Sequence, residues 1–272
     1  MATVTCNHPI WSSEGWKDGH FSISNHTCTP SSNEFSGILS SNAFNEVYSY
    51  DVFNIIIRRL SNKLYFPSLN NITLFGFSAG AQTVLRYSIL PNIEDKTSIK
   101  YIVSDPSTYL YFNNLRPIPD TTFEFAVPNI DWLGKWNWIS GWSNNCTSYN
   151  SWRYGLEHLK GYYEHHLKTE EDVRRVINQF QYTDVIYLVG ADDILNCRLH
   201  PFDSCYDNEL ATYCQAMLQG DNRVDRALKY KAYLTLLYKK PVHQIIFAPN
   251  VPHDAVKMLY SDVGKCVVFG IC

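Results

Sequence analysis

Four short apolar segments, separated by stretches with helical periodicity, constrain the fold of this chain most strongly. Each is a mostly apolar run bounded by polar or turn residues, and the four cover residues 71–76, 100–104, 185–189 and 242–248. Runs of this kind are typical of parallel strands that are covered on both faces. Because helical segments separate them, the pattern predicts a mostly parallel sheet with helices on both faces, which is an α/β fold.

The intervening segments divide into predicted helices and two stretches without clear periodicity. Helices are predicted at residues 50–60, 79–90, 168–180, 208–238 (in two pieces, broken near Gly220) and 254–260. The first of them places one apolar stripe on a single face, made by Val52, Phe53, Ile56, Ile57 and Leu60. Residues 1–47 are predicted to be irregular. Residues 107–165 are too long for a bare connection and predict an insertion with its own packing, within a single domain over residues 1–272.

Composition narrows the classes of function. Hydrophobic residues make up 45% and charged residues 18% of the chain, which is typical of a globular protein. No apolar run approaches the roughly 20 residues that a membrane helix needs, so no membrane span is predicted. The formal net charge of −3 gives no basic surface of the kind that binds nucleic acid, so no nucleic-acid partner is expected.

The eight cysteines favour disulfides over metal binding. None of them lies in a CxxC pair, which weakens a zinc or thioredoxin-like interpretation. Three glycosylation sequons begin at Asn25, Asn71 and Asn145 and point to the same oxidising compartment as an even cysteine count. The N-terminus lacks the basic start and apolar stretch of a signal peptide. We nevertheless expect a secreted or endomembrane-lumen glycoprotein, for the reason given below.

A serine between two glycines is the strongest chemical signal. Gly76-Phe77-Ser78-Ala79-Gly80 follows a predicted strand and opens a predicted helix, as in a nucleophile elbow. The serine at such a bend has a strained backbone, and we expect side chains two residues before or after it to collide. The helix N-terminus offers the N–H of Ala79 as an oxyanion donor. The alternative is an ordinary Gly-Ser turn with a solvated hydroxyl.

A base and an acid follow in the order that a serine nucleophile requires. Asp193 comes just after the strand 185–189, and His253 lies in the loop after the strand 242–248, so both are expected at the carboxyl edge of the sheet. Asp192 is the next candidate for the acid, and Asp105, after the strand 100–104, is the third. An aspartate after a strand can also be only a turn former or a helix cap.

His253 is the favoured base because it alone follows the last strand in a proline-containing loop. His243 begins a strand and is expected to be packed, while His165 and His166 lie on a polar helical segment and are expected to be solvated. The remaining candidates precede the predicted sheet: His8, His20 and His26. A solvated surface role for His253 is the alternative.

The chain resembles the α/β-hydrolase superfamily, through the ordered motifs GFSAG, VGADD and VPHD. More narrowly, it is similar to largely uncharacterised α/β-hydrolase-like proteins of plants, fungi and other microbes. The strings that carry this resemblance extend over most of the chain: WKDG (16–19), SYDVFNIII (49–57), FPSLNNITLFGFSAGAQTVLRY (66–87), YIVSDPSTYLYF (101–112), NSWRYGLE (150–157), CQAMLQGDNRVDR (214–226) and PHDAVKMLYSDVG (252–264). The resemblance implies a Ser78–His253–Asp193 triad that needs no cofactor or metal.

The sequence departs from that superfamily at its N-terminal end. Such hydrolases carry earlier strands and a His-Gly segment that completes the oxyanion hole, and no such segment precedes Ser78; His8-Pro9 is a poor substitute because proline has no N–H. We therefore expect a partial hydrolase fold, truncated before its central strands, which also accounts for the missing signal peptide. The strand 71–76 is then expected to leave an edge open to association with a partner.

The tryptophan-rich insertion, the polar string after Gln219 and the later cysteines each allow more than one role. Five of the seven tryptophans lie between Trp132 and Trp152, where the insertion either forms a cap over the site or packs as a satellite core. The string from Gln219 to Arg226 is expected to cap a helix and pair with acids rather than bind a substrate carboxylate. Cys214 is expected, with Cys197 and Cys205, to anchor loops near Asp193. The sequence thus predicts a serine hydrolase for small esters, thioesters or amides, with an inactive hydrolase-like binding protein as the alternative.

Overall fold

The computed structural model describes residues 4–6, 28–30, 49–90, 97–119, 121, 123–129, 146–196 and 210–272. Its centre is a four-stranded sheet made of the four predicted strands, in the order β3 (Asn71–Phe77), β4 (Ser98–Ser104), β7 (Asp184–Gly190) and β8 (Gln244–Ala248). Every neighbouring pair is parallel. The predicted parallel α/β fold is therefore confirmed, and within the described ranges β3 lies at one edge of this sheet.

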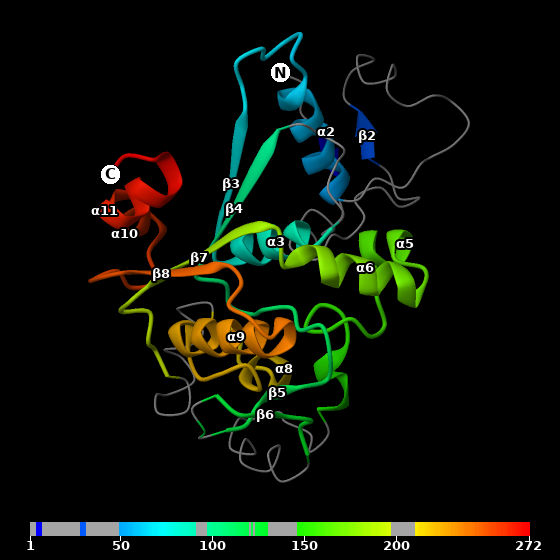
Figure 1. The fold of residues 1–272 in the computed structure, drawn as a ribbon, viewed down its shortest axis with the longest axis vertical. Coiled ribbons are helices and arrows are strands. Elements are labelled where there is room, and N and C mark those ends of the chain that lie inside the picture. Colours follow the sequence, from blue (N-terminus) through cyan, green and yellow to red (C-terminus); the bar gives the residue numbers. More distant parts are fainter. Residues whose placement is uncertain are drawn as a thin grey trace.

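The predicted helices form close to their expected positions (Figure 1). They are α2 (Ser49–Ser61), α3 (Ala79–Ser88), α6 (Glu170–Phe180), α8 (Cys214–Met217), α9 (Arg223–Tyr238) and α10 (Ala255–Tyr260), followed by the short α11 (Asp262–Gly264) and η4 (Lys265–Phe269). A capping box between Thr169 and Asp172 begins α6, and the side chain of Asn222 caps α9. Gly220 adopts a φ of 143° at the break between α8 and α9, as the sequence predicts near that residue.

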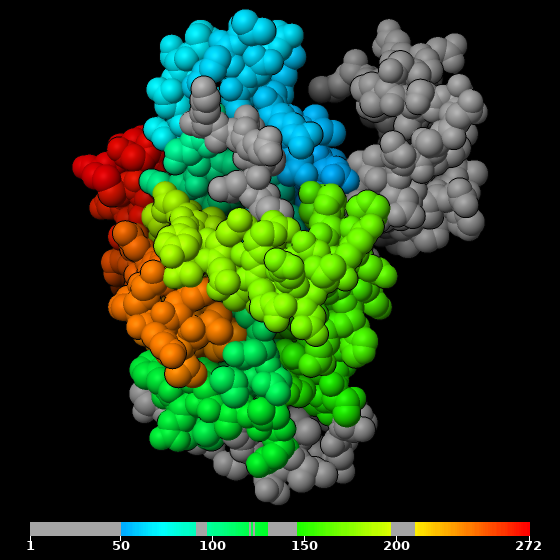
Figure 2. All heavy atoms as spheres, turned by 45° about the vertical axis from the view of Figure 1, so that its right-hand side comes forward, coloured from blue at the N-terminus to red at the C-terminus, as the bar shows by residue number. Residues whose placement is uncertain are grey.

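The two faces of the sheet belong to two separate apolar cores, because side chains alternate along each strand. Tyr101, Val103 and Tyr187 lie in the larger core, which also contains buried residues of α2, α3, α6 and α9. Ile102 and Leu188 point to the other face, where Val251, Met258 and other C-terminal residues cover them. Figure 2 shows the C-terminal residues in red against the β3 side of the molecule, and α9 in orange beside the insertion.

The apolar face predicted for α2 is partly wrong. Ile57 of α2 is buried, but Ile56 is 49% exposed, although the sequence pattern places both on the apolar side. The buried stripe runs instead through Tyr50, Phe53 and Ile57, at i, i+3 and i+7, and Tyr50 is fully buried against Tyr87 and Tyr163. The run of three isoleucines hides this stripe, because hydrophobicity alone cannot say which of them faces the core.

The described part of the insertion packs as a core rather than as a loose loop. It contains the paired strands β5 (Arg116–Pro117) and β6 (Phe125–Ala126), η3 (Thr147–Asn150) and α5 (Tyr162–His166). Tyr111 packs on Tyr233 of α9 with ring centroids 4.5 Å apart. A disulfide between Cys146 and Cys214 joins η3 to α8. Trp132, Trp136, Trp138 and Trp142 lie outside the described residues, so the cap over the site stays a prediction.

Two short strands pair within the N-terminal segment. Residues 1–47 are predicted to be irregular, yet β1 (Val4–Cys6) and β2 (Cys28–Pro30) pair antiparallel within them. Strands of three residues leave no periodicity to detect, and their pairing depends on distant chain segments. No helix in the described ranges is both long and apolar enough to span a bilayer.

Candidate active site

Ser78 occupies the tight bend between β3 and α3. Its backbone has φ 53° and ψ −114°, a region that non-glycine residues rarely adopt and that is typical of strained functional positions. The bend is held on both sides, since the Ser78 N–H donates to the carbonyl of Ser104 on β4 and the Ser78 carbonyl accepts from the Gln82 N–H. Ser78 is therefore fixed at the carboxyl end of β3 and at the N-terminus of α3.

The two flanking glycines have different roles. A Cβ on Gly76 would lie 2.3 Å from the carbonyl oxygen of Gly80, so α3 can cross β3 this closely only when residue 76 has no side chain. A Cβ on Gly80, however, would meet no atom within 4 Å. The expectation that a side chain at either glycine collides is thus correct for Gly76 and wrong for Gly80. The Gly-x-Ser-x-Gly motif alone cannot show that Gly76 lies against the backbone of α3 while Gly80 faces empty space.

His253 reaches Ser78 from the loop that follows β8. Its Nε2 lies 3.1 Å from the Oγ of Ser78, although the two residues are 175 positions apart in the chain. The next residue, Asp254, caps α10 by accepting from the N–H groups of Val256 and Lys257. The imidazole of His253 also stacks on the ring of Phe77, with centroids 4.8 Å apart. The cap and the stacked ring together limit how the imidazole can turn.

Asp193 binds the other nitrogen of the same imidazole. Its Oδ2 lies 2.8 Å from Nδ1 of His253, and its side chain is only 4% exposed. The neighbouring Asp192 is exposed, in agreement with the order in which the sequence ranks the two. The three residues favoured from the sequence, Ser78, His253 and Asp193, therefore form one continuous line of hydrogen-bonding groups.

Gly190 allows these two loops to approach each other, a role that sequence reasoning missed. It ends β7, and a Cβ at this position would lie 2.4 Å from the carbonyl oxygen of Val251. The Asp192 N–H donates to that same carbonyl, which joins the loop of Asp193 to the loop of His253. The signal for this role was the glycine that ends the predicted strand in VGADD.

Asp105, the third candidate for the acid, lies nearby but binds other groups. It is fully buried, its Oδ1 accepts from the Gly190 N–H at 2.8 Å, and its Oδ2 accepts from the Ser104 hydroxyl at 3.1 Å. Burial raises the pKa of Asp105 to about 7, and the negative charge of Asp193 adds to the effect. Its φ of 49° is also in the left-handed region. Asp105 supports the end of β7 instead of contacting the imidazole.

Arg223 was expected to pair with an acid, and its partner is Asp193. Its Nη1 lies 3.4 Å from Oδ1 of Asp193, the oxygen that His253 does not contact, and its side chain is only 1% exposed. Sequence reasoning assigned Arg223 a structural role and did not connect it with the site. The polar string at the start of α9 was the available signal, but its position beside Asp193 depends on the tertiary fold.

The other histidines are placed elsewhere. His243 lies 2.8 Å from the carbonyl oxygen of Phe180 and 3.2 Å from the Tyr187 hydroxyl, as expected for a packed residue, and burial lowers its pKa. His165 and His166 are both exposed, as expected, although His166 also stacks on Tyr162 in α5 and desolvation lowers its pKa. His8, His20 and His26 lie outside the described residues, as do Cys197 and Cys205.

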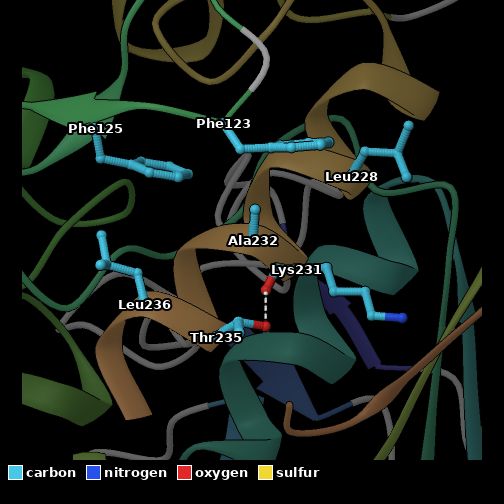
Figure 3. Close-up of a pocket in the computed structure, with 7 residues that line it drawn as sticks. All are labelled: Phe123, Phe125, Leu228, Lys231, Ala232, Thr235 and Leu236. Carbon is cyan, nitrogen blue, oxygen red and sulfur yellow. Dashed lines mark hydrogen bonds between the residues drawn. The ribbon is translucent and has the colours of Figure 1, made fainter. Parts of the chain in front are cut away.

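A separate pocket of about 470 Å³ lies between α9 and the insertion (Figure 3). Its lining is mostly apolar and consists of Phe123, Phe125, Leu228, Lys231, Ala232, Thr235 and Leu236. In the close-up the two phenylalanine rings of the insertion face the outer side of α9. None of Ser78, Asp193 and His253 lines this pocket, so it is not the space in front of the nucleophile.

The site is suited to proton transfer from a serine hydroxyl. An imidazole within hydrogen-bonding distance can accept the Oγ proton, and a buried carboxylate on its other nitrogen stabilises the imidazolium that results. The first backbone N–H groups of α3, including that of Ala79, have no partner in the preceding turn of the helix and lie at its positive end. Among the residues that the structure describes, no group of three or more His, Cys, Asp and Glu side chains is placed to hold a metal ion.

Comparison with known proteins supports the fold. No protein-family model matches the sequence, and no curated protein matches it. Among solved structures, the poly(3-hydroxybutyrate) depolymerase LpqC of Bordetella parapertussis, an α/β-hydrolase, matches with a TM-score of 0.53 and 17% identity. The match covers 95% of this chain and 64% of the depolymerase. A monoacylglycerol lipase of Paleococcus ferrophilus matches with 16% identity over 82% of this chain and 73% of its own, but its TM-score is only 0.28. The chain therefore has a partial α/β-hydrolase fold, as predicted.

Proposed function

We propose that this chain is a serine hydrolase that acts on a carboxylic ester, thioester or amide. In this proposal Ser78 is the nucleophile, His253 is the general base and acid, and Asp193 orients the imidazole and stabilises its charged form. The substrate carbonyl carbon is attacked by Oγ of Ser78 while His253 takes the hydroxyl proton. His253 then returns that proton to the leaving group, and water hydrolyses the acyl-enzyme by the same steps in reverse order.

One observation carries the proposal, namely the two contacts of a single imidazole. Nε2 of His253 lies 3.1 Å from the serine hydroxyl and Nδ1 lies 2.8 Å from a buried carboxylate, and the three residues come from distant parts of the chain. Purely structural polar groups rarely converge on a serine with a strained backbone at a helix N-terminus. The positive φ of Ser78 and the missing Cβ of Gly76 support the same assignment.

The tetrahedral intermediate requires hydrogen-bond donors for its oxyanion. We assign one of them to the backbone N–H of Ala79, the first residue of α3. Loss of one such donor costs on the order of 10²–10³ in rate in other serine enzymes. A second donor is not assigned, and the activity of this chain is expected to be low if that donor is absent.

The substrate class is proposed from chemistry and from the solved neighbour. The depolymerase is named for a polyester, poly(3-hydroxybutyrate), which supports esters as the first class to test; the present chain spans only 64% of its length. The disulfides Cys146–Cys214 and Cys266–Cys272 fit an oxidising environment. We therefore propose a secreted or endomembrane-lumen enzyme.

A series of p-nitrophenyl esters of increasing acyl length tests the activity. We expect turnover with at least one acyl length, and a loss of about 10³-fold or more in Ser78→Ala and in His253→Gln, with unchanged circular dichroism. A folded wild-type chain that hydrolyses none of these esters, or a Ser78→Ala variant that keeps its activity, would contradict the proposal. The first outcome would favour an inactive hydrolase-like binding protein instead.

A further inference from the structure

The acid of the candidate site has a second buried partner. Asp193 uses Oδ2 for His253 and Oδ1 for Arg223, so each carboxylate oxygen faces a different nitrogen group. Arg223 and Asp193 are 1% and 4% exposed, so this contact is shielded from water and from salt. A carboxylate held at both oxygens cannot rotate freely about its last side-chain bond. The pair therefore affects both the orientation and the charge of the group that contacts His253.

Arg223 is itself held firmly at the beginning of α9. The preceding residue, Asn222, caps the helix by accepting from the Asp225 N–H at 2.8 Å. One turn later Arg226 is fully buried, and its guanidinium donates to the carbonyl of Ser107 at 2.6 Å and to that of Ala211 at 2.9 Å. Arg226 thus fastens the first turn of α9 to the loop after β4 and to the segment before α8. This fastening fixes the direction from which Arg223 approaches Asp193.

The charges around Asp193 come from three other elements. His253 approaches from the loop after β8, Arg223 from α9, and Asp105 from the end of β4; Arg226 lies next to Arg223 on α9. A buried carboxylate beside an imidazole strengthens its hold on a proton, because the negative charge stabilises imidazolium. The Arg223 guanidinium opposes this effect of Asp193, because it is a cation paired with the same carboxylate.

We propose that Arg223 is a positioning residue, which holds Asp193 in the orientation that His253 requires and opposes, through its positive charge, the pull of that carboxylate on the imidazole proton. The role in catalysis rests on the proposed hydrolase function. The effect on the imidazole does not, because it follows from charge alone. A general base must be unprotonated to accept the serine proton, so a nearby fixed positive charge extends activity toward lower pH.

The test measures the titration of His253 without any substrate. We expect ¹⁵N NMR of the imidazole to report a higher pKa in Arg223→Met than in the wild type, by on the order of one pH unit, because removal of a cation strengthens proton binding by the His253–Asp193 pair. The same upward shift is expected in the acid limb of kcat/KM, with a fall in kcat of about 10-fold or more. Arg223→Lys keeps the charge and should stay within about 0.3 unit of the wild type.

Arg116→Met is the matched control for loss of a buried cation. Arg116 is also fully buried, but its guanidinium binds the carbonyl oxygens of Asn113, Leu115, Tyr149 and Tyr154 and the side-chain oxygen of Asn150, and not Asp193. Its loss should lower the melting temperature and leave the pKa of His253 in place. If Arg223→Met does not fold, Arg223→Gln replaces it in the same titration.

The outcomes separate the two proposals. An unchanged pKa of His253 in a folded Arg223→Met or Arg223→Gln variant would overturn the role of Arg223, and so would an equal shift in Arg116→Met. A shifted pKa in a chain that hydrolyses no ester would support the electrostatic role of Arg223 while contradicting the hydrolase proposal.

Discussion

Replacing each glycine around Ser78 by alanine separates the packing of the bend from its sequence motif. In Gly76→Ala the new Cβ would lie 2.3 Å from Gly80 O, 2.5 Å from Gly80 C and 2.8 Å from Ala81 N. All three are backbone atoms of α3 or its first turn, so no side chain can move aside. Ordinary contact begins at 3.4 Å, so α3 must move away from β3 by about 1 Å. Such overpacking costs about 3 kcal/mol when the backbone has to shift.

This cost predicts a fall in melting temperature of about 5–10 °C for a chain of this size. Ser78 starts the displaced helix, and a misplacement of about 1 Å can reduce catalysis about 10²-fold. Gly80→Ala is the matched control, because its Cβ meets nothing within 4 Å and alanine favours a helix by up to about 1 kcal/mol relative to glycine. We expect it to melt at or slightly above the wild-type temperature.

Differential scanning calorimetry and ester hydrolysis should be measured on both variants. Equal melting temperatures for Gly76→Ala and the wild type would refute the argument from close crossing. Equal damage from both substitutions would show that the motif as a whole, and not the contact at residue 76, determines the bend.

Three further outcomes are expected. Asp193→Asn should lower kcat about 10³–10⁴-fold, whereas Asp192→Asn at the exposed neighbour should stay within about 2-fold in the same assay. Asp105 keeps its proton up to about pH 7 in the folded state and loses it near 4 in the unfolded state, so stability should fall between about pH 4 and 7 by up to a few kcal/mol. Asp105→Asn should remove that fall in melting curves recorded from pH 4 to 8, and an unchanged slope would contradict the assignment. The double variant Cys146→Ser with Cys214→Ser removes a disulfide between residues 68 positions apart. It should lower the free energy of unfolding, measured by urea titration, by about 4 kcal/mol. A loss below about 1 kcal/mol would contradict a stabilising role of this disulfide.

The strands and the elbow could be predicted because they depend on local sequence. An apolar run, a Gly-x-Ser-x-Gly bend and a helical stripe are all read within about ten residues, and each of β3, Ser78 and α3 appears where the sequence indicates. The order Ser, Asp, His also located the polar groups, because the carboxyl ends of parallel strands meet at one edge.

What could not be predicted depends on contacts between distant segments. The empty space beside Gly80, the crossing at Gly190 and the approach of Arg223 to Asp193 each involve atoms that no local pattern specifies. The exposure of Ile56 could not be predicted either, because three consecutive isoleucines fit several helical faces. Only the packing of Tyr50 selects the face that is buried.

Labelling with a fluorophosphonate tests the central claim most directly, because such probes react with a serine only when a neighbouring base has activated it. We predict one modified site in the folded wild-type chain, located at Ser78 by peptide mass spectrometry. Labelling should be absent in Ser78→Ala and slowed at least about 100-fold in His253→Gln. A folded chain that remains unlabelled, or one that carries the probe equally in Ser78→Ala, would contradict the account.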